Sequence, residues 1–240
     1  MNEMHILSSP EEMSYHDNVA NDKLVSMLII LDFDGVLFQR RKFKIKYQKI
    51  FNAHGISKNV YTRTYNAAKQ LKYTYSIDAH LKIVRKQYPA LAHDRIRRDL
   101  WALAGQGHQF IFRDARPFLS FFKKQKAVLA LLSSGFPSFQ KKKIRTSRIQ
   151  KFFDRVIVIP SLKKTTALVT LMKHGPSAFF IDDTAEIIDA VQKRFPSVYT
   201  IQLRRDEMEK KSVRVDAVVR SLMGARREII ARTKKRGRRM

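Results

Sequence analysis

The stretch that decides the fold is Val25-Ser26-Met27-Leu28-Ile29-Ile30-Leu31, which ends abruptly in Asp32-Phe33-Asp34-Gly35. A short apolar run that is stopped by polar residues and glycine is typical of a buried strand in a parallel sheet. We therefore expect Asp32 and Asp34 to stand at the carboxyl end of such a strand.

The same pattern of an apolar run followed by polar residues recurs further along the chain. Residues 127–132 precede Ser133-Ser134-Gly135, and residues 178–181 precede Asp182-Asp183. Two more strands are predicted at residues 155–159 and 198–203. Helical patterns separate these runs, at residues 117–124, 139–153, 165–174 and 185–195. Strands that alternate with helices predict an α/β fold with a Rossmann-like, doubly wound parallel sheet.

The interval of residues 38–114 interrupts this alternation. It has no strand pattern, but it has amphipathic helical stretches at residues 47–54, 60–71, 77–88 and 91–104. We predict a helical cap over 38–114, inserted after the first strand of an α/β core that comprises 25–37 and 115–231. A loose arm is predicted for residues 1–24 and a basic tail for residues 232–240.

The chain is strongly basic, with 48 Lys and Arg against 21 Asp and Glu and a net charge of +27. Residues 38–117 alone hold 18 of the basic residues and 4 of the acidic ones. This excess favours nucleic acid or another polyanion as a partner of the cap and the tail. Without such a partner, the tail cations should repel one another and stay extended. Basic runs such as Arg40-Arg41-Lys42 and Lys141-Lys142-Lys143 are also typical of solvated helix faces.

The chain contains no cysteine, so disulfides, zinc–thiolate sites, iron–sulfur clusters and cysteine nucleophiles are excluded. No apolar run approaches the roughly 20 residues of a membrane-spanning helix. The first 22 residues lack the basic start and apolar stretch of a secretory signal. We expect no membrane association and a cytoplasmic location.

The polar residues that follow the strands carry the predicted chemistry. In an open parallel sheet, ligands bind beyond the carboxyl ends of the strands, where four carboxylates and a hydroxyl would gather. Two unit charges about 4 Å apart repel by about 4 kcal/mol at an effective dielectric constant near 20. Such a cluster shifts its pKa values or binds a cation, and oxygen ligands suit Mg²⁺. Since protein-bound Mg²⁺ commonly takes up water and substrate phosphate, the pattern points to phosphoryl chemistry.

Three segments, in this order along the chain, resemble the motifs of the haloacid dehalogenase superfamily. They are Leu31-Asp32-Phe33-Asp34-Gly35-Val36-Leu37, Leu131-Leu132-Ser133-Ser134-Gly135 and Phe180-Ile181-Asp182-Asp183-Thr184. The resemblance spans about residues 27–223, since residues 215–222 are similar to the closing segment of that family. It implies an α/β core with a helical cap inserted after the first strand, which would shield the site from water.

The resemblance also implies roles for individual residues. Asp32 would be the nucleophile that forms an aspartyl-phosphate, and Asp34 the general acid and then the base. Because family members that do not hydrolyse phosphate esters often replace the second aspartate, Asp34 favours a phosphatase. Mg²⁺ would be held by Asp32, the backbone carbonyl of Asp34 and Asp182, with assistance from Asp183. Phosphoryl oxygens would be bound by Ser133 and the amide of Ser134.

The family also uses a lysine to offset charge at the nucleophile and the phosphoryl group. Lys164 fits this role best, because it opens the helix before the strand that ends in Asp182. Lys163 is adjacent, and Lys141, Lys142 and Lys143 are further alternatives.

These observations predict a Mg²⁺-dependent phosphatase that acts on a small phosphomonoester, since a cap over the site excludes bulky polymers. A phosphatase for nucleotides or nucleic-acid ends is the first alternative, supported by the basic cap and tail. A nucleic-acid-binding protein with a vestigial site is the second. The presence of both Asp32 and Asp34 argues against the latter.

Overall fold

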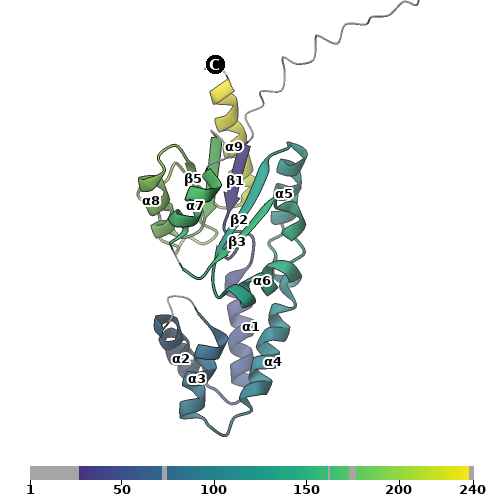
Figure 1. The fold of residues 1–240 in the computed structure, drawn as a ribbon, viewed down its shortest axis with the longest axis vertical. Coiled ribbons are helices and arrows are strands. Elements are labelled where there is room, and N and C mark those ends of the chain that lie inside the picture. Colours follow the sequence, from purple (N-terminus) through teal and green to yellow (C-terminus); the bar gives the residue numbers. More distant parts are fainter. Residues whose placement is uncertain (1–26, 72–74, 162, 173–176, 238–240) are drawn as a thin grey trace, which may run out of the picture.

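The computed structural model describes residues 27–71, 75–161, 163–172 and 177–237. Their centre is a six-stranded, fully parallel sheet in the order β3-β2-β1-β4-β5-β6 (Figure 1). The strands are β1 (Met27–Leu31), β2 (Val128–Ser134), β3 (Arg155–Ile159), β4 (Ser177–Asp182), β5 (Tyr199–Leu203) and β6 (Ala217–Val219). The predicted doubly wound α/β fold is confirmed. The short edge strand β6 lies within the segment that resembles the family's closing motif.

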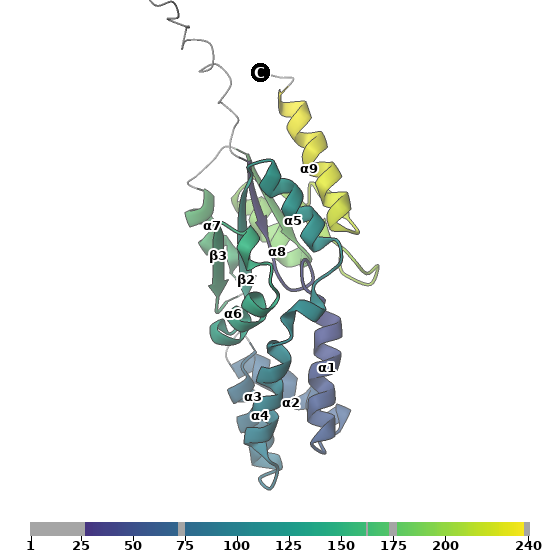
Figure 2. The same cartoon turned by 90° about the vertical axis from the view of Figure 1, so that its right-hand side faces the viewer.

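Helices cover both faces of the sheet because β1 is apolar on both sides. Ile29 and Leu31 pack in one buried cluster with side chains of α5 (Ala115–Lys124) and α9 (Leu222–Gly237). Leu28 and Ile30 pack in a second cluster with α7 (Lys164–Met172) and α8 (Ala185–Arg194). Figure 2 shows α5 and α9 on one side of the strands and α7 on the other. This burial of both faces explains why the predicted strands are continuous apolar runs.

Of the helices described between β1 and β2, the first four form a separate layer at one end of the sheet (Figure 1). They are α1 (Arg40–Ala53), α2 (Lys58–Leu71), α3 (Ile77–Gln87) and α4 (His93–Ala104). A 3₁₀ helix, η1 (Gly107–Phe110), follows them. This helical segment after the first strand is the arrangement expected from the sequence, and we call it the cap.

The two connections between cap and core are bonded to each other. The amide of Gln39 donates to the carbonyl of Phe110 at 2.7 Å, and the amide of Phe112 donates to the carbonyl of Leu37 at 3.0 Å. Phe38 is fully buried beside Phe110, with ring centroids 5.5 Å apart. Two short connecting segments, hydrogen-bonded to each other and well packed, therefore join the cap to the sheet.

A chain of polar side chains crosses the interior of the cap. The hydroxyls of Tyr47 and Tyr75 are 2.5 Å apart, and the Tyr75 hydroxyl lies 2.9 Å from His80 Nδ1. His80 Nε2 lies 2.8 Å from Thr64 Oγ1, whose own proton is donated to the Val60 carbonyl at 2.8 Å. Because Thr64 can then only accept from His80, Nε2 carries a proton.

One of the predicted helices is divided in two in the structure. The helix expected over residues 139–153 is divided into α6 (Pro137–Thr146) and the 3₁₀ helix η2 (Gln150–Phe152). The backbone of Arg148 lies in the left-handed region, with φ of 59°, and ends the first helix.

The expectation of an extended tail over residues 232–240 is wrong for residues 232–237, because α9 continues to Gly237. The arm predicted for residues 1–24 and the last three tail residues lie outside the described residues. None of the helices in the described part of the chain is long and apolar enough to cross a bilayer.

The buried imidazole makes a pH-dependent contribution to stability that can be measured. Burial lowers the pKa of His80 from 6.5 to about 4. Between these values the unfolded chain binds a proton that the folded chain does not, so the free energy of unfolding falls as the pH drops through this window. We expect His80 to account for a loss of about 3 kcal/mol between pH 7 and pH 4.

Denaturant unfolding at both pH values checks this prediction. His80→Gln should lose much less stability on acidification than the unmodified protein. His108→Gln, which replaces an exposed histidine of η1, should keep the full loss. Equal acid losses in the two variants would contradict the assignment.

Candidate active site

Three buried carboxylates meet at the carboxyl ends of the two central strands. β1 and β4 are parallel neighbours with Leu31 opposite Ile181, so that Asp32 and Asp182 leave the sheet side by side. Asp32, Asp182 and Asp183 each offer an oxygen within 4.8 Å of the others. We call these three residues the carboxylate cluster.

Lys164 neutralises part of this cluster. Its Nζ donates to Asp32 Oδ1 at 2.5 Å and to Asp182 Oδ2 at 2.7 Å, and its side chain is 2% exposed. Burial alone would lower the pKa of Lys164, but Asp182 and Asp32 raise it above its ordinary value. Lys163, by contrast, is exposed. Of the lysines considered from the sequence, Lys164 is the one that contacts Asp32.

The remaining negative charge of the cluster is energetically costly. Burial raises the pKa of Asp32 to about 8, and Asp182 and Asp183 add to this rise while Lys164 opposes it. Burial and Asp182 raise the pKa of Asp183 to about 7, against the opposing charge of Arg40. The cluster therefore favours either protons or a further cation.

Asp34 is separate from the cluster and has its own cation. Lys143 Nζ donates to its two carboxylate oxygens at 2.7 and 2.9 Å, and Gln140 Nε2 donates to Oδ2 at 2.7 Å. Both partners come from α6, where they are one helical turn apart. The expectation that the run containing Lys143 is a solvated face is wrong for this residue, because its side chain is only 7% exposed.

Arg40, the first residue of α1, connects the cap to the cluster. Its Nη2 lies 3.1 Å from Asp183 Oδ2. The negative charge of Asp183 explains why the Arg40 guanidinium faces the cluster although the Arg40 side chain is half exposed. Arg40 is therefore solvent-exposed, as predicted, and also pairs with the carboxylate cluster.

The two serines predicted to bind phosphate have different surroundings. Ser133 is fully buried, and its hydroxyl accepts a hydrogen bond of 2.7 Å from Gln140 Nε2. The Ser134 hydroxyl is buried and has no hydrogen-bond partner among the described residues. Ser134 also borders the cavity described below. Its hydroxyl is thus available to a ligand, while that of Ser133 is already engaged.

Gly35 is required by the approach of the Asp183 carboxylate. Its φ is +90°, and a Cβ at this position would lie 2.0 Å from Asp183 Oδ2. Any side chain at this position would displace Asp183 from the cluster, which explains why the first motif has a glycine here.

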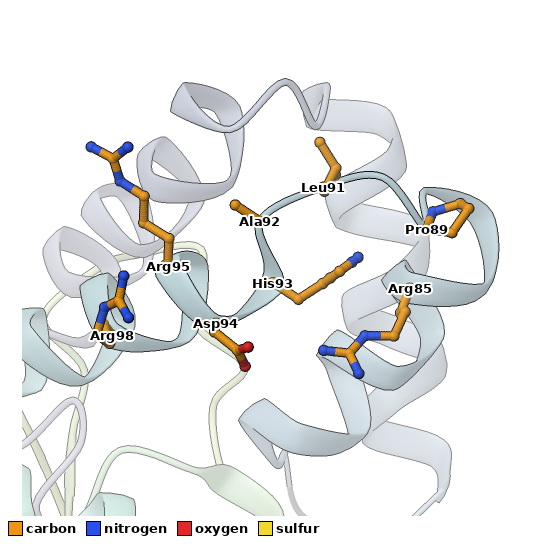
Figure 3. Close-up of a pocket in the computed structure, with 8 residues that line it drawn as sticks. All are labelled: Arg85, Pro89, Leu91, Ala92, His93, Asp94, Arg95 and Arg98. Carbon is orange, nitrogen blue, oxygen red and sulfur yellow. The ribbon is translucent and has the colours of Figure 1, made fainter.

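A cavity of about 600 Å³ connects the site to the cap. Asp32, Asp34 and Lys164 line its core side, and side chains of α1 and α2 line the opposite side. A second cavity, of about 560 Å³, lies at the turn between α3 and α4 (Figure 3). It shares no lining residue with the first and contains a single carboxylate, Asp94, among three arginines. The chemistry suggested by the motifs therefore belongs to the first cavity.

The carboxylate cluster fits a hard divalent cation. Its donors are closely spaced oxygens, and within the described ranges no other group of His, Asp or Glu meets the spacing of a metal site. Oxygen donors without nitrogen or sulfur favour Mg²⁺ over transition metals. Asp32, Asp182 and Asp183 would supply side-chain oxygens. The carboxylate of Asp34 would not, since it is bound to α6.

The fold and the site together define a doubly wound α/β core with a carboxylate cluster beneath a helical cap. Residues 27–186 match the sequence profile of haloacid dehalogenase-like hydrolases. Since this match covers more than half of the chain, the protein belongs to the haloacid dehalogenase-like hydrolase family.

Solved structures support the same fold. A protein of Burkholderia xenovorans described as a haloacid dehalogenase-like hydrolase has a TM-score of 0.71 at 17% identity, covering 87% of this chain and 98% of its own. The magnesium-bound HAD-hydrolase YfnB of Bacillus subtilis has a TM-score of 0.64 at 15% identity, with coverages of 85% and 98%. L-2-haloacid dehalogenase of Xanthobacter autotrophicus has a TM-score of 0.62 at 14% identity, with coverages of 84% and 97%. A comparison with curated protein sequences finds no significant match.

The ion pairs of Lys164 predict a specific stability effect. Lys164→Met leaves Asp32 and Asp182 buried without their cation, and removing one partner of a buried pair costs about 3–5 kcal/mol. We expect a loss of this size in the free energy of unfolding, measured with denaturant in EDTA.

Lys163→Met is the matched control, because the adjacent lysine is exposed, and it should change stability by less than about 0.5 kcal/mol. Similar effects of the two substitutions would argue against the buried pairs.

Proposed function

We propose that the protein is a Mg²⁺-dependent phosphatase that hydrolyses a phosphomonoester through an aspartyl-phosphate. The observation that carries this proposal is the Asp34 carboxylate, held at the cavity by Lys143 and Gln140 two residues after Asp32. Phosphoester hydrolysis needs a second carboxyl group there to transfer protons, whereas related enzymes with other substrates often replace it.

In the first half-reaction, an Asp32 oxygen attacks phosphorus while the bond to the leaving oxygen breaks, and Asp34 gives that oxygen a proton. In the second, Asp34 takes a proton from water, which attacks phosphorus and releases Asp32 and inorganic phosphate. Lys143 donates to both oxygens of Asp34 and keeps this carboxylate beside the cavity. Lys164 holds Asp32 in place and offsets negative charge as a phosphate dianion enters.

We propose that the metal binds at Asp32, Asp182 and Asp183, as the family resemblance implies. A bound Mg²⁺ would offset the charge of these carboxylates and of the phosphoryl group. The backbone carbonyl of Asp34 remains the further ligand expected from the sequence. Ser134 lines the cavity and its hydroxyl has no partner among the described residues, so it is more available to a phosphoryl oxygen than Ser133.

The cavity supports a small substrate. Its volume of about 600 Å³ lies within the roughly 300–1,000 Å³ of small-molecule sites. Because the cap forms one of its walls, a folded polymer could present only a protruding end. We therefore favour a metabolite over a nucleic-acid end, and a cytoplasmic location stays a prediction.

Hydrolysis of p-nitrophenyl phosphate tests the proposal. We expect turnover with Mg²⁺ and none in EDTA. Asp32→Asn should lower kcat by at least about a thousandfold, and Asp34→Asn by about a hundredfold or more, the scale of general acid–base catalysis. Asp78→Asn, which changes an exposed carboxylate of α3, is the control and should retain activity.

Two outcomes would contradict the proposal. One is turnover by Asp32→Asn within tenfold of the unmodified protein. The other is release of chloride from L-2-chloropropionate without any hydrolysis of phosphomonoesters, which would assign a dehalogenase instead.

The basic residues at the end of α9 support a second, separate proposal, in which they bind a polyanion. Arg232, Lys234 and Lys235 are exposed along the last turns of this helix. If they contact phosphates, binding to duplex DNA weakens with salt by a log–log slope of about −0.9 per contact.

Fluorescence anisotropy with a DNA duplex at several salt concentrations tests this idea. Deletion of residues 232–240 should flatten the slope and leave kcat/KM for p-nitrophenyl phosphate within about twofold. An unchanged slope would show that residues 232–240 do not contact the DNA.

A further inference from the structure

Six basic side chains line the cavity, and their ion pairs divide them into two groups. They are Arg40, Arg41, Lys44, Lys69, Lys143 and Lys164. Four of them have carboxylate partners, since Arg40 pairs with Asp183, Arg41 with Asp206, Lys143 with Asp34 and Lys164 with Asp32. Lys44 and Lys69 have no carboxylate partner among the described residues.

These two lysines lie on the cap wall, in α1 and α2. Lys44 Nζ lies 4.7 Å above the centre of the Tyr65 ring, which also lines the cavity. Burial, and then the charges of Lys69 and Arg40, lowers the pKa of Lys44. The cap wall thus carries two exposed cations that repel each other, and neither has a carboxylate partner among the described residues.

A buried hydroxyl on the same wall also lacks a partner. Tyr61 is 1% exposed and lines the cavity, yet its hydroxyl makes no hydrogen bond among the described residues. The hydroxyls of Tyr47 and Tyr75, in contrast, are bonded to each other. A buried hydroxyl without a partner is unfavourable, and a polar ligand group in the cavity would satisfy it.

The transferred phosphoryl group does not account for Lys44 and Lys69. In the proposed mechanism its charge is offset by Lys164, beside Asp32, and by the cation that Asp32, Asp182 and Asp183 could hold. We propose that the substrate carries a second anionic group, a carboxylate or a second phosphate, which Lys44 and Lys69 bind while the phosphoryl group lies at Asp32. This inference rests on the phosphatase function proposed above and narrows its substrate class to phosphomonoesters with two anionic ends.

Pairs of substrates that differ only in the second anionic group test the inference. One pair is 3-phosphoglycerate and glycerol 3-phosphate, which share the leaving oxygen and differ by a carboxylate against a hydroxymethyl group. A longer pair is fructose 1,6-bisphosphate and fructose 6-phosphate. In at least one pair, we expect kcat/KM to be ten times or more higher for the doubly anionic member.

The double variant Lys44→Gln/Lys69→Gln should bring that ratio close to one, mainly through a higher KM for the doubly anionic member. The matched control is Lys49→Gln/Lys58→Gln. It removes the same charge from the same two helices at exposed positions outside the cavity lining, and it should keep the ratio. A ratio near one for both pairs in the unmodified protein would overturn the inference, as would an equal loss of the ratio in both double variants.

Binding separates this inference from the proposed function. Calorimetry with Asp32→Asn compares the affinities for 3-phosphoglycerate and glycerol 3-phosphate, and for the fructose pair, without turnover. If the unmodified protein hydrolyses neither p-nitrophenyl phosphate nor these compounds, the phosphatase proposal fails. A preference for the doubly anionic ligand that depends on Lys44 and Lys69 would still support the second anion site. Equal affinities within both pairs would overturn it, whatever the catalytic result.

Discussion

The repulsion between Asp32, Asp182 and Asp183 is the constraint on which the site depends. Parallel pairing of β1 with β4 forces Asp32 and Asp182 together, and burial denies all three carboxylates the screening of water. The surrounding residues are arranged to offset this charge. Lys164 bridges two of the carboxylates, and Arg40 reaches the third from the cap. The cost that remains raises the pKa values of Asp32 and Asp183, and a cluster of this kind could hold a divalent cation.

The cavity therefore has two walls with different tasks. The core wall holds charges that are nearly matched, because each cation near Asp32 or Asp34 is paired with a carboxylate. The cap wall combines tyrosine rings with the unmatched charges of Lys44 and Lys69. Chemistry thus belongs to the sheet edge, whose geometry is set by backbone pairing. In our proposal, selection among substrates belongs to Lys44 of α1 and Lys69 of α2, which do not pair with the carboxylate cluster.

The strands and the carboxylates could be predicted because both depend on local sequence. Buried parallel strands require unbroken apolar runs. The strand ends place Asp32, Asp34 and Asp182 at one edge of the sheet, independently of the conformation of the loops. The partners on helices could not be predicted in this way. Gln140 and Lys143 reach Asp34 only because of how α6 is docked, and the sequence offers Lys141 and Lys142 as equals. Arg40 looks like any other member of a basic run until the cap is placed over the sheet.

The end of α9 shows that local charge alone does not predict whether a segment is helical or extended. Repulsion between its cations suggested an extended tail, yet lysine and arginine are good helix formers, and the helix is anchored by tertiary contacts. Ile229 is fully buried, the Tyr199 hydroxyl donates to Glu228 at 2.5 Å, and Arg232 lies over the Tyr199 ring. These anchors come from β5, more than twenty residues earlier, and a local sequence pattern does not contain them.

The central position of β1 has a consequence for the order in which the protein is made. Leu31 pairs with Leu131 and Ile181, which are synthesised 100 and 150 residues later. The cap helices contact their sequence neighbours and can begin to form while most of the sheet has not yet been translated. The first strand, which leads into Asp32, can pair with β2 and pack against α5 early, but its other edge has no partner until β4 leaves the ribosome. In a nascent chain the carboxylate cluster is consequently one of the last features to assemble, because a chain that ends before β4 lacks Asp182 and Asp183.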